Sequence, residues 1–292
     1  ITQTVYPVSP AIVIPANPAD RYCLLPGGEC IRSDASYSTI NDANRIDASL
    51  DAVTLNATWD ISQNYELAFV AGWRQSDEDV FWDTDGTAKT VFNVLRRQSY
   101  EQWSAELRVA SNYEGPFNFV AGVFHFESDY TLEQAIKLDL AVGTGAAVPI
   151  GSAYVNGSGD GDWHSATTSA VFIQGDYKLT DTLTFTLGAR ATWDHKKIYT
   201  EFYAAPFGTA PNAYQVTDGI PAGRALSAAG RGGAEDSWFE VTPKVAFNWQ
   251  PYENLLLYAS FSKGYNAGGF SARAGTVAAV TTPYDPETIS SY

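Results

Sequence analysis

The feature that most constrains the fold is a recurring pattern of about ten residues in which apolar and polar side chains alternate. In residues 183–194 every odd position is apolar and every even position is polar or small. Successive side chains of a β-strand point to opposite faces, so the pattern predicts strands with one apolar face and one polar face. The other segments with this pattern are 51–59, 65–74, 100–110, 117–124, 169–178, 238–249 and 255–262.

The connections between these predicted strands alternate between short and long. The short ones close four hairpins at 60–64, 111–116, 179–182 and 250–254, and the long ones are 77–98, 131–164, 198–235 and 271–286. Soluble domains seldom repeat long loops, because most of their connections have about four to six residues. Bacterial outer-membrane barrels combine short periplasmic turns with long extracellular loops. The pattern therefore predicts an all-β fold, an antiparallel transmembrane β-barrel with long extracellular loops.

Strand length and aromatic placement favour a membrane over a soluble core. The predicted strands approach the roughly 9–11 residues that cross a bilayer at a tilt. Aromatic rings with a polar edge favour the boundary between membrane and water. Aromatic residues stand near the segment ends at Trp59, Tyr65, Trp73, Phe117, Tyr177, Trp193, Phe239, Trp249 and Tyr258. A soluble all-β domain in which these rings cap an ordinary core stays open as an alternative.

Charge and composition agree with an exported membrane protein. The formal net charge is −15, which argues against nucleic-acid binding, and charged residues make up only 17% of the chain. No apolar run reaches the roughly 18 residues of a membrane helix. A charged side chain on the lipid face would cost energy, so the charges in the polar register are predicted to line a lumen. These candidate lumen-lining residues are Glu66, Arg74, Glu106, Arg108, Asp176, Arg190, Asp194, Glu240 and Lys244.

Residues 1–47 are predicted to form an extracellular loop region, because five prolines and the Gly27-Gly28 pair interrupt any regular element. The only two cysteines, Cys23 and Cys30, flank a Pro-Gly-Gly turn. A loop-closing disulfide formed in an oxidising compartment is the leading interpretation, because no histidine pair at liganding spacing completes a metal site. The chain contains no methionine, so we expect either a processed chain or, as the favoured interpretation, part of a longer protein.

Several motifs resemble one known family. Residues 258–270 read YASFSKGYNAGGF, and residues 286–292 read PETISSY. Together with 101–111 and 187–194, they resemble barrel strands of the TonB-dependent outer-membrane receptors, over about residues 48–292. Each motif alone is weak, but their order and spacing are fairly specific.

The resemblance implies a 22-strand barrel plugged by an N-terminal domain, of which this chain holds eight or nine strands over 48–292. The plug domain, the TonB box and the C-terminal strands are expected to lie outside the chain. It also implies an outer-membrane transporter of a Gram-negative bacterium, driven by the TonB complex through the plug region. The ligand would be a ferric siderophore, a vitamin or an oligosaccharide. Outer-membrane lipid and lipopolysaccharide are the expected neighbours. A small barrel acting as anchor, adhesin or pore is the alternative, and an outer-membrane hydrolase is a weaker one.

The loops hold the candidate ligand contacts Trp82, Asp83, Asp85, Arg224 and Arg231. Asp83, Asp85 and the run 158–162 could also offer oxygens to calcium, but neither segment has the bidentate Glu of a complete calcium loop, so solvated turns are favoured. Asp194 and His195 are neighbours on a predicted strand and point to opposite faces, so they form no ready dyad. With no G-x-S-x-G, H-E-x-x-H or phosphate-loop motif, the sequence predicts neither an enzyme nor a bound cofactor.

Overall fold

The structure is a computed structural model that describes residues 45–83, 92–139, 149–156, 164–203, 226–272, 274 and 276–292. Almost all of these residues lie in long β-strands. The strands are β1 Arg45–Ser62, β2 Tyr65–Asp83, β3 Phe92–Ser111, β4 Phe117–Asp139, β5 Pro149–Asn156, β6 His164–Thr180, β7 Leu183–Tyr203, β8 Leu226–Tyr252, β9 Leu255–Asn266 and β10 Glu287–Ser291. One short helix, α1 Val277–Thr281, lies between β9 and β10.

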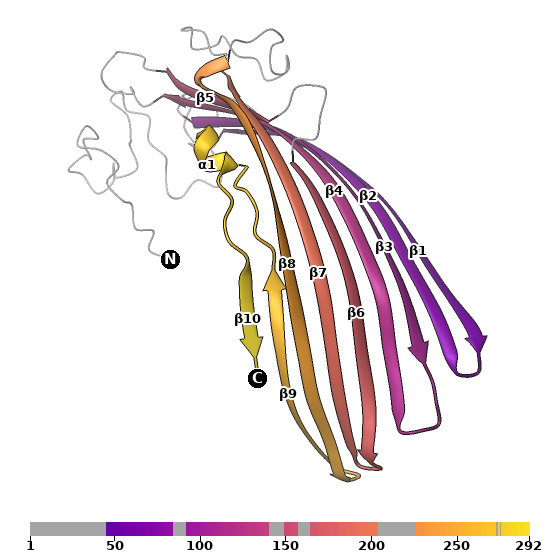
Figure 1. Cartoon of the computed structure of the whole chain (residues 1–292). Helices are drawn as coiled ribbons and strands as arrows, with labels where there is room; N and C mark the ends of the chain where they lie inside the picture. The colour runs from indigo at the N-terminus through magenta and orange to yellow at the C-terminus, as the bar shows by residue number, and fades with distance from the viewer. Residues whose placement is uncertain are drawn as a thin grey trace, which may run out of the picture.

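The ten strands form a single antiparallel sheet that curves along its length (Figure 1). Neighbours in the sequence are neighbours in the sheet, except that β5 and β6 share one position between β4 and β7. β6 pairs with the parts of β4 and β7 that adjoin the short turns, and β5 pairs with the parts beyond. Among the described strands, β1 and β10 each pair on one side only, so the sheet has two open edges.

The predicted all-β antiparallel architecture is confirmed, and each predicted strand lies within an observed one. The observed strands run further, so that β2 enters the segment 77–98, β4 enters 131–164, and β7 and β8 enter 198–235. The strand β5 inside 131–164 and the helix α1 inside 271–286 were not predicted. Hydrogen bonding to a neighbour extends these strands beyond the alternating segments, because a ladder continues without regard to which residues are apolar. The predicted disulfide cysteines Cys23 and Cys30 lie outside the described residues.

Strand register assigns each side chain to one of two faces. From β1 to β9, paired positions are odd with odd and even with even, apart from shifts near strand ends. One row across the odd face is Phe69, Leu107, Val123, Val171, Ala191 and Val241. The adjacent row on the even face is Val70, Glu106, Phe124, Ala170, Thr192 and Glu240. The two faces therefore differ in chemistry across six strands.

A small hydrophobic cluster lies at the end of the sheet remote from the short turns. Ile198 and Phe202 of β7 pack with Phe270 and Val280 from the segment between β9 and β10. α1 contacts both β7 and β8, as Figure 1 shows near the top of these strands. Thr276 caps the helix by accepting a hydrogen bond from the Ala279 amide. This cluster fixes one long connection against the even face.

Candidate functional site: two chemically different faces of one sheet

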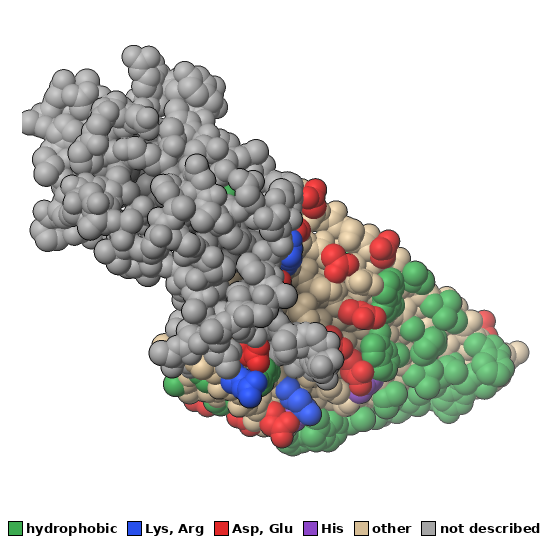
Figure 2. Space-filling view, turned by 90° about the horizontal axis from the view of Figure 1, so that it is seen from above, with side chains coloured by type: hydrophobic (Ala, Val, Ile, Leu, Met, Phe, Trp, Pro, Cys, Tyr) green, Lys and Arg blue, Asp and Glu red, His purple; other side chains and the backbone are tan. Residues whose placement is uncertain are grey.

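The odd face carries a wide band of exposed apolar side chains beside the short turns. Figure 2 shows hydrophobic side chains gathered into a continuous field, with acidic side chains along its border. Soluble monomers rarely expose an apolar surface of this extent, which marks contact with lipid or another apolar partner. Exposed members on the odd face include Val53, Leu55, Trp59, Trp103, Leu107, Val123, Val171, Ile173, Leu187, Trp193, Phe239, Val241, Phe247 and Trp249.

Aromatic residues mark both borders of this apolar band. On β8 the band runs from Phe239 to Trp249, ten residues apart. At about 3.3 Å per residue and a tilt of about 40°, this corresponds to roughly 25 Å, the height of the apolar band of outer-membrane barrels. At the border away from the turns, Trp73 Nε1 donates to Glu101 Oε1 at 2.8 Å, and Trp103 Nε1 donates to Glu127 Oε2 at 3.1 Å. These indoles thus have one apolar and one polar neighbour, as rings at a membrane boundary require.

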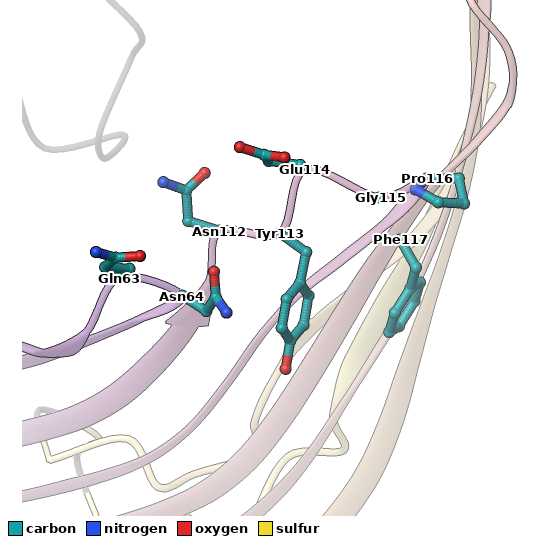
Figure 3. Close-up of a pocket in the computed structure, with 8 residues that line it drawn as sticks. All are labelled: Gln63, Asn64, Asn112, Tyr113, Glu114, Gly115, Pro116 and Phe117. Atoms are coloured by element: carbon teal, nitrogen blue, oxygen red, sulfur yellow. The ribbon is translucent and has the colours of Figure 1, made fainter.

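The short turns form a compact polar rim at the opposite border. The turn between β3 and β4 is held by Asn118, whose Oδ1 accepts from the Tyr113 amide at 2.7 Å and from Ser111 Oγ at 3.0 Å. Tyr113 also hydrogen bonds to Tyr65. A hollow of about 810 Å³ lies there. In Figure 3 the Tyr113 and Phe117 rings point away from the Glu114 side chain. Of the residues that line this hollow, Tyr113 and Glu114 are titratable.

All nine predicted lumen-lining residues lie on the even face, at even positions of β2, β3, β6, β7 and β8. Most have polar partners there. Two of the carboxylates accept hydrogen bonds from threonines: Asp194 Oδ1 from Thr168 Oγ1 and Asp176 Oδ1 from Thr186 Oγ1, both at 2.6 Å. Lys263 Nζ lies 2.8 Å from Glu240 Oε1, and Arg108 Nη1 lies 3.5 Å from Glu106 Oε1. Lys244 Nζ donates to Gln174 Oε1 at 3.2 Å. Two more of the residues with predicted lumen positions, Glu66 and Arg74, lie on β2. The even face is therefore a polar wall with charges of both signs.

Arg190 occupies a supported position in this wall. Its guanidinium carbon lies 5.2 Å from the Phe124 ring centroid and 5.7 Å from that of Phe172, and its Nε donates to Thr192 Oγ1 at 3.3 Å. The Phe172 ring lies over Gly122, where a Cβ would approach Phe172 Cζ to 2.5 Å and the Leu107 carbonyl to 2.8 Å. Only glycine leaves room for the ring there. Glycine at 122 thus positions Phe172, and Phe172 positions Arg190.

A second group on the even face was not predicted from the sequence. Tyr100, Tyr130 and His164 occupy one row across β3, β4 and β6, with ring centroids 6.4 Å apart in each adjacent pair. Burial, together with the positive charge of Lys196, lowers the pKa of His164. The row could have been found by extending the even parity beyond the alternating segments, since Tyr100 and Tyr130 hold even positions.

Lys196 ties the segment after β9 to the wall. Its Nζ donates to the Gly268 carbonyl at 2.7 Å and lies 5.8 Å from the Trp238 ring centroid. Burial lowers the pKa of this ammonium, and the nearby Asp194 acts in the opposite direction. The contact joins β7 to a residue far along the chain, so the sequence alone gives no signal for it.

The predicted loop contacts are placed only in part. The Trp82 ring lies 5.2 Å from the Arg96 guanidinium, and Arg231 Nη1 lies 3.7 Å from Glu201 Oε1, so both engage neighbouring strands. Asp83 is the last residue of β2, and its side chain lies outside the described part of the structure. The same holds for Asp85, Arg224 and residues 158–162. Within the described ranges, no group of three or more His, Cys, Asp or Glu is arranged to hold a metal ion.

Asp194 and His195 point to opposite faces, as predicted. Asp194 accepts from Thr168 on the even face, whereas His195 Nδ1 lies 2.8 Å from Ser237 Oγ on the odd face. In the described part of the chain, no helix has the length and apolarity that crossing a membrane requires.

Comparison of the sequence with known protein families identifies the family. Residues 14–292 match the protein family described as TonB dependent receptor-like, beta-barrel. The chain belongs to this family. The resemblance inferred from its motifs is thus confirmed, and the sheet is a portion of a receptor β-barrel. No curated protein matches the chain in sequence.

Solved TonB-dependent receptors share the fold. The ferric yersiniabactin uptake receptor FyuA from Yersinia pestis is 16% identical, with a TM-score of 0.61 over 87% of this chain and 34% of its own. The siderophore receptor PiuA from Acinetobacter baumannii is 14% identical, with a TM-score of 0.53 over 85% of this chain and 37% of its own. The ferric citrate transporter FecA is 11% identical, with a TM-score of 0.51 over 84% and 31%. The chain thus spans about a third of the length of these receptors.

Proposed function

We propose that the chain is part of a TonB-dependent transporter that takes up a scarce ligand across the outer membrane of a Gram-negative bacterium. The observation that carries the proposal is the family match over residues 14–292 on a chain whose odd face bears an exposed apolar band. The family consists of receptors rather than enzymes. The remaining parts of the barrel, a plug and the TonB-contacting segment would come from the rest of the protein.

The two faces have distinct roles in this proposal. The apolar odd face meets outer-membrane lipid, and lipopolysaccharide meets the border where Trp73 and Trp103 bond to carboxylates. The even face, with the nine predicted charged residues, lines the lumen. Charges of both signs are tolerated there because water or protein occupies the interior, whereas Arg or Lys on the lipid face would cost roughly 2–4 kcal/mol near the midplane.

The ligand proposed for this transporter is an iron complex. The similar solved structures are a ferric yersiniabactin receptor, a siderophore receptor and a ferric citrate transporter, which favours an iron complex over a vitamin or an oligosaccharide. The acidic surface beside the apolar band also suits a position facing the medium, where divalent cations bridge lipopolysaccharide.

The test is uptake by the host strain with and without the intact gene. Growth and accumulation of radiolabelled iron complexes, cobalamin and oligosaccharides are compared in the wild type, a deletion strain and a strain lacking TonB. We expect one ligand class to be lost in both mutants and restored by the gene only where TonB is present. Uptake that persists without TonB would support a passive pore instead, and no lost ligand in the deletion strain would contradict the transport role.

A further inference from the structure

We infer that Arg108, Arg190 and Lys244 form a pocket on the even face that binds a carboxylate group. The pocket has a volume of about 460 Å³, within the range that holds a small ligand or one of its moieties. The inference rests on the proposed function in one respect, since it takes the even face to be the lumen wall. It adds a defined anion site at the level of the apolar band.

The charge of the pocket contrasts with that of the chain. Its walls contain four cationic side chains, Arg108, Arg190, Lys244 and Lys263, and one carboxylate, Glu106. Their sum is 4 − 1 = +3, and including Glu240, which pairs with Lys263 at 2.8 Å, it is 4 − 2 = +2. The whole chain carries −15. A local positive excess in so acidic a protein attracts an anion into a recess of limited volume.

The pocket is built in advance of binding. Gly122 admits the Phe172 ring, and Phe172 and Phe124 carry the Arg190 guanidinium on their faces. Gly188 lies between its strand partners Gln174 and Lys244 and has no side chain to fill the space there, where a Cβ would approach Gln174 Cβ to 3.4 Å. A guanidinium fixed in this way loses little conformational freedom when it binds, which raises affinity for a ligand.

The chemistry of the donors favours a carboxylate over a phosphate. A planar guanidinium presents two parallel N–H groups that match the two oxygens of a carboxylate. Phosphate sites commonly add backbone N–H groups from a helix start or a nest. Here the backbone of β4, β6, β7 and β8 is engaged in the sheet ladders, and the donors are side chains. Arg108 makes a long 3.5 Å contact to Glu106 and is half exposed, so it can turn toward a stronger acceptor.

The carboxylate could come from two sources with the same chemistry. One is a free organic acid or a carboxylate of the transported ligand. The other is an acidic side chain of this protein outside residues 1–292, because the similar receptor FyuA, of which this chain covers 34%, is about two and a half times as long as this chain. The test distinguishes them with the intact receptor purified in detergent, using sodium benzoate as the probe and calorimetric titration as the readout.

The variants are Arg190→Gln and Lys244→Gln in the pocket, Arg190→Lys to retain charge without the planar fork, and Lys197→Gln as a control. Lys197 is on the odd face, half exposed, and 3.5 Å from an exposed Glu235, so its loss should matter little. If the pocket binds a free carboxylate, benzoate binds the wild-type receptor. Both Gln variants then weaken benzoate binding about tenfold, equivalent to about 1.4 kcal/mol. Arg190→Lys weakens it less, and Lys197→Gln leaves it unchanged.

For a carboxylate supplied by the protein itself, benzoate does not bind the wild type. Both Gln variants then lower the thermal unfolding midpoint by several degrees more than Lys197→Gln, and this difference shrinks in about 1 M salt, where charges are screened. The inference is overturned if benzoate binds all variants equally. It is also overturned if benzoate fails to bind and the pocket variants match the control or lose stability independently of salt. These measurements need no transport, so their failure would leave the uptake experiment as a separate test.

Discussion

Leu107→Arg tests the assignment of the odd face to lipid. Leu107 lies midway along the apolar segment of β3, is 42% exposed, and pairs with Phe69 and Val123 in the row that crosses the centre of the band. Phe69 and Val123, the partners of Leu107 on the neighbouring strands, offer an arginine no polar group, so the new side chain meets hydrocarbon at this depth. The expected cost is about 2–4 kcal/mol, which raises the unfolding equilibrium constant about 30- to 1,000-fold.

Ser104→Arg is the matched control on the same strand. Ser104 points to the even face opposite Gly72, where there is space, and Glu106 lies two residues away to accept the new charge. We expect this variant to change stability by less than about 1 kcal/mol. The assay is guanidinium unfolding of the intact receptor in phospholipid vesicles, followed by fluorescence of its tryptophans. Equal stability of the two variants, or a greater loss in Ser104→Arg, would refute the assignment of the faces.

Three further changes test contacts of the even face. Gly122→Ala should cost about 1–3 kcal/mol because the new Cβ meets Phe172 and a backbone carbonyl, whereas Gly115→Ala, with open space around it, should cost almost nothing; equal unfolding midpoints would contradict this. Lys196→Met should remove a charge-assisted hydrogen bond worth roughly 1.5–3 kcal/mol and speed amide hydrogen exchange in residues 267–285, whereas the control Lys197→Met should not. Unchanged exchange in Lys196→Met would show that Lys196 does not hold this segment against β7. The pKa of His164 is lower in the folded protein than in the unfolded chain. As the pH falls through about 6.5, the unfolded chain therefore binds a proton that the folded protein does not, and the free energy of unfolding decreases. His164→Gln should flatten this loss between pH 7 and pH 5, and an identical pH slope in both proteins would contradict it.

The alternating segments were sufficient to predict the fold. In residues 183–194 every side chain falls on the predicted face, because a strand with one lipid face and one polar face is periodic in sequence as well as in space. The same alternation of odd and even positions predicted from the sequence alone that Arg190, Asp194 and Glu240 lie on one face of the sheet. Family motifs such as YASFSKGYNAGGF then identified the receptor family, which alternation alone could not distinguish from other barrels.

The parts that escaped prediction depend on contacts between distant residues. β5 and the outer ends of β4, β7 and β8 lack clear alternation, because beyond the apolar band neither face is required to be apolar. Lys196 reaches Gly268 across 72 positions, and Gly122 accommodates Phe172 from another strand. The pairing register of the strands decides which charged residues of the even face pair with each other and which surround the pocket. A one-residue slip would have moved every one of them.

The proposed transport function requires that odd positions face lipid and even positions face the lumen. The most direct measurement is spin labelling of single cysteines at positions 183–194 of the intact receptor in vesicles, with Cys23 and Cys30 replaced by serine. Collisions with oxygen, which concentrates in lipid, and with a water-soluble nickel complex are compared at each position. We predict that oxygen contact peaks at odd positions and falls at even ones along β7. Equal oxygen contact at odd and even positions, or peaks at even positions, would contradict it.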